Sequence, residues 1–435
     1  MPRRSARRCP LRPEAPLTSH SIAEPLKELG IDPRPLKAQL RRAQRMRKLR
    51  AFALVLPLLL FLLLTFVAPI LDMLRLAVFD NELASVWPQV TQTIRVWNDR
   101  SKLPPPAVFD ALAADLAASY RARTLPTAAR RLNYAIDNGR SLVFGTARQL
   151  PATSQDWAAT LQKLDPRWGD LNTWAAIDQA SGPTTSYFLL AAVDLKKTAD
   201  GHIAAMPAEQ AIYIDVLMRT FTVSFTVTLL CIVLGFPVAY LLATQPPGRA
   251  NLLMILVLLP FWTSLLVRTA AWIVLLQEQG LVNNALIWLG IVDRPIRLIY
   301  NRVGVYIAMT HILLPFLILP LYSVMKGIKP SYMQAAMSLG ASPTAAFLRV
   351  YLPLTLPGIG AGALLVFILA LGYYITPALI GGAADQMISY FIAFYTSDTV
   401  NWGMAAALGT VLLIATLLLY WVYDRLVGIS NVKLG

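Results

Sequence analysis

Long apolar runs alternate with polar stretches along the chain. The first run covers residues 51–71, whose twenty-one residues extend roughly 31 Å as a helix and can cross the hydrocarbon core of a bilayer. Five further apolar runs follow a long gap, at about 216–243, 252–276, 303–325, 358–380 and 402–423. The pattern therefore predicts an all-α integral membrane protein with six transmembrane helices.

The gap at residues 72–215 holds no apolar run long enough to span a membrane. Apolar residues recur at helical spacing over 108–120 and 125–136, and prolines at 104–106, 126, 151 and 166 punctuate the stretch. The gap is therefore expected to be a large, mostly helical and water-exposed insertion between spans one and two.

Charge sets the expected orientation. Six Lys and Arg residues occupy 41–50, directly before the first span, and the positive-inside rule places that side in the cytoplasm. Two alternative interpretations are that the basic residues at 1–50 bind nucleic acid and that the first apolar run belongs to a cleaved signal peptide. The link 278–302 resists the rule, because it is expected outside yet carries Arg294, Arg297 and Arg302.

These patterns predict five parts with both termini in the cytoplasm. They are a basic cytoplasmic tail at 1–50, the first transmembrane helix at 51–71, an extracytoplasmic insertion at 72–215, a five-helix core at 216–427 with a cytoplasmic loop at 326–357, and a cytoplasmic tail at 428–435.

Composition excludes several classes of protein. The chain is 56% hydrophobic and 14% charged, whereas a soluble protein carries about a quarter charged residues. Its 2 cysteines and 3 histidines lie far apart, so neither a disulfide framework nor a metal site is expected. A phosphate-binding G-x-x-x-x-G-K-[ST] loop is missing as well, so no catalytic residue and no bound cofactor is expected in this chain.

The link 326–357 has the signals of a compact helical hairpin. Ser331 is a good N-cap for a short first helix, and Gly340 suits the position just after its end. Ser342 and Pro343 begin a second helix, which Pro353 is expected to stop before the next span. Its small, partly apolar face suits a groove on another protein, and an ordinary cytoplasmic hairpin is the alternative.

This link resembles the EAA loop of binding-protein-dependent ABC importer permeases of the MetI-like fold. The matching residues are Gln334, Ala335, Ala336, Gly340, Leu352 and Pro353. In that family the loop docks into a cytosolic ATPase. Gln334 stands where the family usually has Glu, so a charge-assisted contact would be lost.

The resemblance extends over 216–427, and segments 258–272, 314–325 and 372–382 are similar to the subgroup that imports spermidine, putrescine or opines. It implies a bacterial inner-membrane subunit fed by a periplasmic solute-binding protein. Its implied partners also include two copies of an ATPase, which bind ATP and Mg²⁺, and a second, different permease. A stand-alone secondary carrier or channel, and a membrane-anchored sensor acting through 72–215, are the other readings.

Five residues are candidates for the substrate route. Arg268 is a charge inside an apolar run and either lines a path or marks an early end of the span. Tyr373 and Tyr374 precede Pro377 and are expected to interrupt their span, as route or as core residues. His311 is a proton relay or a satisfied buried histidine, and Trp262 suits an aromatic belt or the route.

The acidic residues constrain the solute. The predicted spans contain no Asp or Glu that would hold a polycation. A weak selector is therefore expected, with discrimination left to the solute-binding protein. If Arg268 lines the route, it favours a carboxylate-bearing solute such as an opine.

Overall fold

The computed structural model describes residues 33–427, with side chains over 45–425. Residues 1–32 of the predicted basic tail and the predicted tail 428–435 lie outside the described residues. The chain divides into two compact units, Met1–Asp72 and Met73–Gly435.

The first unit carries the first candidate span. Helix α2 (Pro33–Leu62), a π-helical turn η1 (Leu63–Val67) and α3 (Ala68–Leu76) run on as one helix. The candidate span Arg45–Leu76 contains the predicted apolar run 51–71. The π turn lies just before Pro69, whose ring would clash with the carbonyl four residues earlier in a regular helix.

The insertion is mostly helical, as its periodicity predicts. Its elements are α4 (Glu82–Val86), α5 (Pro88–Thr93), η2 (Ile94–Val96), α6 (Pro106–Arg121), α7 (Leu125–Asn133), α8 (Gly139–Gln149), α9 (Trp157–Leu164), η3 (Pro166–Gly169), α10 (Leu171–Gln179), α11 (Tyr187–Ala191), β1 (Leu195–Lys197) and β2 (Ile203–Ala205). The two strands pair antiparallel with Lys196 opposite Ala204, and the helical periodicity gave no sign of them.

Four buried tryptophans fill the core of the insertion: Trp87, Trp97, Trp168 and Trp174. Each indole N–H has an acceptor, so burying these rings leaves no donor unsatisfied. Trp87 donates to Ser119 at 3.0 Å and Trp168 to Thr146 at 2.9 Å, whereas Trp97 and Trp174 donate to backbone carbonyls at 2.9 and 2.8 Å. The insertion thus has a hydrophobic core of its own.

A buried carboxylate joins the insertion to the first helix of the five-helix core. Asp194 accepts hydrogen bonds from the backbone N–H of Tyr213 at 2.9 Å and of Ile214 at 2.8 Å, at the start of α12 (Tyr213–Thr244). Helix N-termini favour negative charge, so this side chain caps α12 from a distance in sequence.

The remaining elements, together with α12, form the core at 216–427. They are α13 (Pro247–Leu258), η4 (Leu259–Trp262), α14 (Leu265–Leu276), α15 (Leu281–Trp288), α16 (Arg302–Gly327), α17 (Ser331–Ser338), α18 (Pro343–Ala346), η5 (Phe347–Tyr351), α19 (Leu352–Leu371), α20 (Ile375–Ile380), η6 (Ala383–Asp385), α21 (Ile388–Ser397) and α22 (Trp402–Val427).

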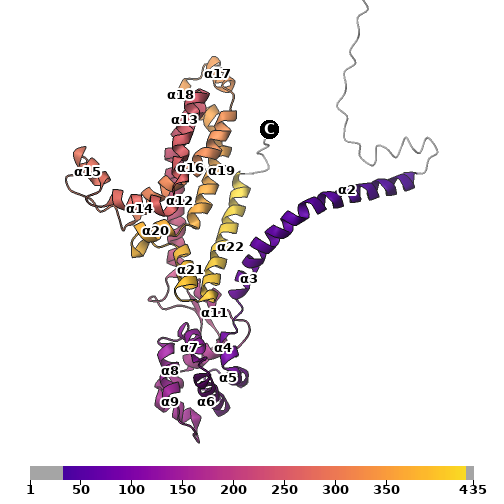
Figure 1. Cartoon of the computed structure of the whole chain (residues 1–435), viewed down its shortest axis with the longest axis vertical. Coiled ribbons are helices and arrows are strands. Elements are labelled where there is room, and N and C mark those ends of the chain that lie inside the picture. Colours follow the sequence, from indigo (N-terminus) through magenta and orange to yellow (C-terminus); the bar gives the residue numbers. More distant parts are fainter. Residues whose placement is uncertain (1–32, 428–435) are drawn as a thin grey trace, which may run out of the picture. The chain divides into compact units, whose positions relative to one another are not determined.

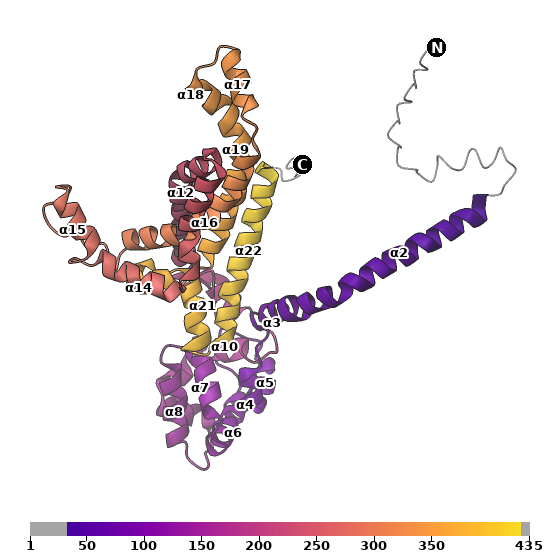
Figure 2. The ribbon, with the colours of Figure 1, turned by 45° about the horizontal axis from the view of Figure 1, so that its top comes forward.

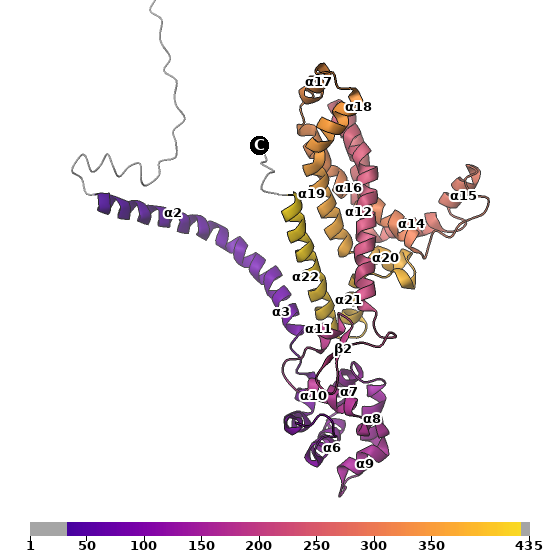
Figure 3. The same ribbon diagram turned by 180° about the vertical axis from the view of Figure 1, so that it is seen from behind.

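Helices α12, α16 and α19 pack side by side at the centre of this core (Figure 1). Val223, Met309 and Val366, one from each helix, are fully buried between them. Helices α14 and α15 leave this bundle sideways (Figure 2). The α17–α18 hairpin stands at one end of the bundle and the insertion at the other (Figures 1 and 3).

Six helices of the described chain are long and apolar enough to cross a membrane, as predicted. Two predicted spans need correction. The run 252–276 is two helices, because the chain turns at Thr263 and Ser264 and the Ser264 side chain caps α14. The run 358–380 breaks at residues 372–374, as the tyrosines predict, and its helix begins much earlier, at Pro343.

Candidate functional site

The α17–α18 hairpin turns at Gly340. This residue has a φ of +93°, a region that a side chain disfavours. The N–H of Gly340 donates to the carbonyl of Met337 at 3.0 Å, and the N–H of Ala341 donates to that of Ala336 at 3.1 Å. These two bonds form a Schellman ending for α17, so the predicted role of Gly340 as the residue after the helix holds.

The caps of the two hairpin helices only partly follow the prediction. Ser342 caps α18 as predicted, accepting the N–H of Ala345 at 3.3 Å, with Pro343 in the first turn. Ser331, the predicted N-cap, is instead the first residue of α17, and the N-cap is Pro330. The second helix also does not stop at Pro353: a π turn, η5, absorbs the missing donor, and the helix continues through α19.

The predicted coupling residues fall into two groups. Gln334, Ala335 and Gly340 are exposed on the hairpin and Ala336 is partly buried, whereas Leu352 and Pro353 begin α19. Leu339, which the sequence analysis did not single out, is 90% exposed at the hairpin tip. An apolar side chain this exposed, next to a fixed glycine turn, is suited to insertion into another protein's surface.

Four aromatic rings, here called the aromatic clamp (Phe236, Tyr240, Phe347 and Tyr351), hold the base of the hairpin to α12. Tyr240 lies edge-on to Phe347 and Tyr351, with ring centroids 5.6 and 5.4 Å apart. Phe236 lies 6.2 Å from Phe347. Because η5 places Phe347 and Tyr351 one above the other, both rings reach the same face of α12. Sequence reasoning missed this cluster, since its halves are more than 100 residues apart.

Arg268 lies in the first turn of α14, just after the break at Thr263 and Ser264. The sequence did not predict that a helix begins at Leu265, and the route-lining role of Arg268 stays a prediction. A cation in the first turn opposes the helix dipole, and its Nε is buried without a hydrogen-bond partner. Among the residues with described side chains, no carboxylate pairs with Arg268.

Three elements bring polar residues together around Arg268. It interacts electrostatically with His311 of α16 and with Tyr373 at the break after α19. The indole N–H of Trp272 donates to Nδ1 of His311 at 3.1 Å. Since that nitrogen accepts a hydrogen bond, His311 carries its proton on Nε2. We call this group the intramembrane junction: Arg268, Trp272, His311 and Tyr373.

Two predicted route residues lie apart from the main group. Trp262 is 77% exposed and Tyr374 is 42% exposed, whereas Tyr373 beside it is partly buried. Trp272, which was not among the predicted route residues, donates its indole N–H to His311. Its residue type gave no signal of that pairing, because the two positions are far apart in the sequence.

A buried hydroxyl pair fixes the junction. The Oγ1 atoms of Thr269 on α14 and Thr376 on α20 lie 3.2 Å apart, and both residues are fully buried. The pair ties the two short helices that follow the breaks, so it holds Arg268 and Tyr373 in place.

Replacing Thr269, Thr376 or both with valine is expected to show coupling. Each single change should lower the free energy of unfolding by about 1 kcal/mol, and the double change by less than the sum. Chemical unfolding in detergent measures this, with Thr222→Val as control, since Thr222 is exposed and bonds only within its helix. Strictly additive losses would show that the hydroxyl pair contributes nothing.

Comparison with known proteins identifies relatives, although no family model matches the chain. The spermidine/putrescine transport system permease protein PotB of Escherichia coli K12 is 38% identical over 220 residues, covering 50% of this chain and 80% of its own. The inner membrane ABC transporter permease protein YdcU of the same organism is 33% identical over 228 residues, covering 49% and 72%. A solved bacterial alginate ABC transporter covers 49% of this chain and 77% of its own at 19% identity, with a TM-score of 0.40.

The fold and these relatives define a multi-pass transport permease of the inner membrane, which is not an enzyme. More narrowly, the chain belongs to the ABC importer permeases of the spermidine/putrescine subgroup.

Proposed function

We propose that the chain moves a small polar organic solute, such as a polyamine or an amino-acid derivative, under the control of a cytosolic ATPase that docks on the loop 326–357. The observation that carries the proposal is the hairpin itself. It presents Leu339 in the open beside a fixed glycine turn, and the aromatic clamp ties its base to a membrane helix. Motion of a docked ATPase would therefore reach the transport route.

The partners and orientation follow from the same proposal. Two ATPase copies, a second and different permease, and a periplasmic solute-binding protein complete the importer. The hairpin end of the bundle lies in the cytoplasm with both chain termini, and the insertion lies outside. Since the hairpin and the insertion stand at opposite ends of α12, α16 and α19, this orientation accommodates both.

The intramembrane junction is proposed to line the route. Broken helices are tolerated in a membrane where they border a cavity, and both breaks of the core, at 263–264 and 372–374, meet here. Arg268 has no acidic partner among the described residues, so the junction offers no carboxylate to select a polycation. Selection would fall to the binding protein, and ATP and Mg²⁺ would bind the ATPase alone.

Reconstitution of the complete importer in lipid vesicles tests the proposal. Putrescine uptake and ATP hydrolysis should both rise when the binding protein is added, and both should require the ATPase. Vesicles that hold this chain and accumulate solute without any ATPase would overturn the proposal and favour a secondary carrier.

A further inference from the structure

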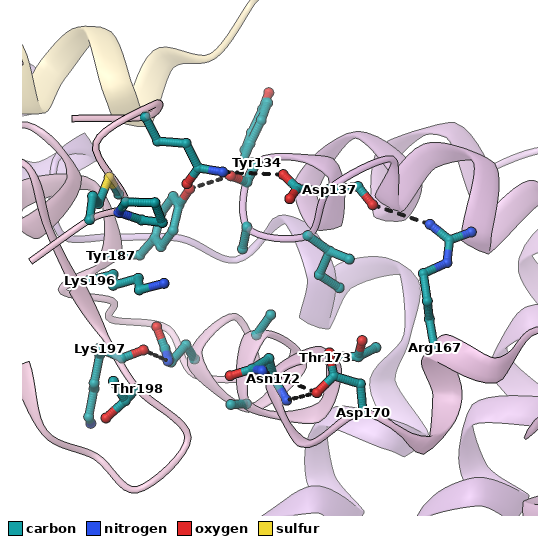
Figure 4. Close-up of a pocket in the computed structure, with 18 residues that line it drawn as sticks. Tyr134, Asp137, Arg167, Asp170, Asn172, Thr173, Tyr187, Lys196, Lys197 and Thr198 are labelled. Atoms are coloured by element: carbon teal, nitrogen blue, oxygen red, sulfur yellow. Dashed lines mark hydrogen bonds between the residues drawn. The ribbon is translucent and has the colours of Figure 1, made fainter. Parts of the chain in front are cut away.

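A hollow of about 440 Å³ opens on the insertion, between its helical body and the strands that lead to α12 (Figure 4). Its floor is α10, where Thr173, Ala175 and Ala176 are small and buried. Larger side chains at these positions would fill the space, so the hollow is a consequence of the α10 sequence. Its volume lies in the range of small-molecule sites.

Arg167 forms one wall of the hollow, and its charge is paired with that of Asp165. Its Nε and Nη2 donate to the Asp165 carboxylate at 3.0 and 2.7 Å, which holds the pKa of Asp165 below its ordinary value. Its Nη1 donates to the carbonyls of Asp137 and Asn138, each at 3.2 Å. Arg167 therefore fixes the loop that carries Asp137 and leaves no free charge for a ligand.

The free charges that face the hollow stand on three of its sides (Figure 4). Asp170 uses Oδ1 to cap α10, through the N–H of Asn172 at 3.0 Å, which leaves its other oxygen available. The side-chain carboxylate of Asp137 accepts one hydrogen bond, from the amide of Gln210 at 3.4 Å. Between the two aspartates, the Lys196 side chain points into the open space, whereas the Lys197 side chain points away from it (Figure 4). Among the described residues, no ion pair includes the Lys196 ammonium.

We infer that this hollow binds a small zwitterion, a molecule with one ammonium and one carboxylate. The ligand ammonium would lie at Asp170, beside the floor of the hollow, and its carboxylate at Lys196. A dication would leave Lys196 opposed by positive charge, and a dianion would face the two aspartates. The inference does not depend on which solute crosses the membrane, because the hollow lies in the insertion and shares no residue with the intramembrane junction.

The position of the hollow gives such a ligand a mechanical consequence. Gln210, which contacts Asp137, lies three residues before Tyr213, where α12 begins. A ligand held between α10 and Lys196 would therefore join the helical body of the insertion to the segment that enters the membrane.

Three four-carbon probes test the inference on the full chain in lipid nanodiscs by equilibrium dialysis. They are γ-aminobutyrate, with one amine and one carboxylate, putrescine, with two amines, and succinate, with two carboxylates. γ-Aminobutyrate should bind most tightly. Lys196→Gln should weaken it by about tenfold or more, and Lys196→Arg should restore part of the loss. Asp170→Asn should weaken it similarly while keeping the helix cap, because Asn caps as well as Asp.

Lys163→Gln is the matched control, since Lys163 is exposed on the insertion and does not line the hollow. Unchanged melting temperatures show that the variants remain folded. Saturable γ-aminobutyrate binding that is equal in the wild type and Lys196→Gln would overturn the inference, as would tighter binding of putrescine or succinate, or no saturable binding by the wild type. Putrescine uptake by the importer is a separate readout, so failure of the transport proposal stays distinguishable.

Discussion

Replacing Gly340 with valine is expected to release the ATPase from the purified importer. A φ of +93° puts a β-branched side chain in a strained backbone region, at about 1–3 kcal/mol. This strain does not come from a steric clash, because no atom lies within 4 Å of the new Cβ position. Strain of this size lowers the population of the correct turn roughly 5- to 150-fold. Co-purification of the ATPase and binding-protein-stimulated ATP hydrolysis should both fall.

Two further glycine variants separate backbone strain from other effects. Gly340→Asn should retain more ATPase than valine does, because asparagine tolerates positive φ better than a β-branched residue. Gly327→Ala is the control, since Gly327 ends α16 at an ordinary φ with the same open space around its Cβ position. Full ATPase binding by Gly340→Val would remove the hairpin from the coupling mechanism.

Replacing Arg268 with glutamine is expected to stabilise the chain and impair transport together. An unpaired charge in a spanning segment costs about 2.5–3.5 kcal/mol on insertion scales, and this one also opposes the dipole of α14. Its removal should raise the melting temperature. If Arg268 lines the route, putrescine uptake should nevertheless fall about tenfold or more, while the ATPase stays bound.

The control for the Arg268 variant is a variant of Arg249, an exposed cation. Arg249→Gln removes an exposed charge from the start of α13 and should change neither uptake nor stability by much. Arg268→Lys keeps the charge and should keep part of the uptake. Unchanged uptake in Arg268→Gln, together with higher stability, would show that the membrane merely tolerates this arginine.

Features that depend on neighbouring residues were predictable from the sequence. Gly340 and Ser342 end and begin helices through bonds to residues within five positions, so their chemistry is visible locally. Hydropathy likewise predicted six spans. It could not place the break at Thr263 and Ser264, because these two small residues interrupt neither the apolar run nor its mean hydropathy.

The positions of the prolines did not predict the helix breaks either. Pro237 and Pro315 remain inside continuous helices, whereas Pro260 precedes a break, since packed neighbours in a membrane can satisfy the freed carbonyls. The junction itself depends on tertiary pairs. Trp272 and His311 meet from positions 39 apart, and such pairs leave no periodic trace in the sequence.

Helix α12 extends from the insertion to the base of the hairpin. Its 32 residues extend about 48 Å as one helix, with the Asp194 cap at its first turn and the aromatic clamp near its last. A tilt or rotation imposed at the capped end must therefore appear at the clamped end, because a helix transmits torque along its length. In the orientation proposed above, one continuous helix thereby couples the insertion to the hairpin across the bilayer.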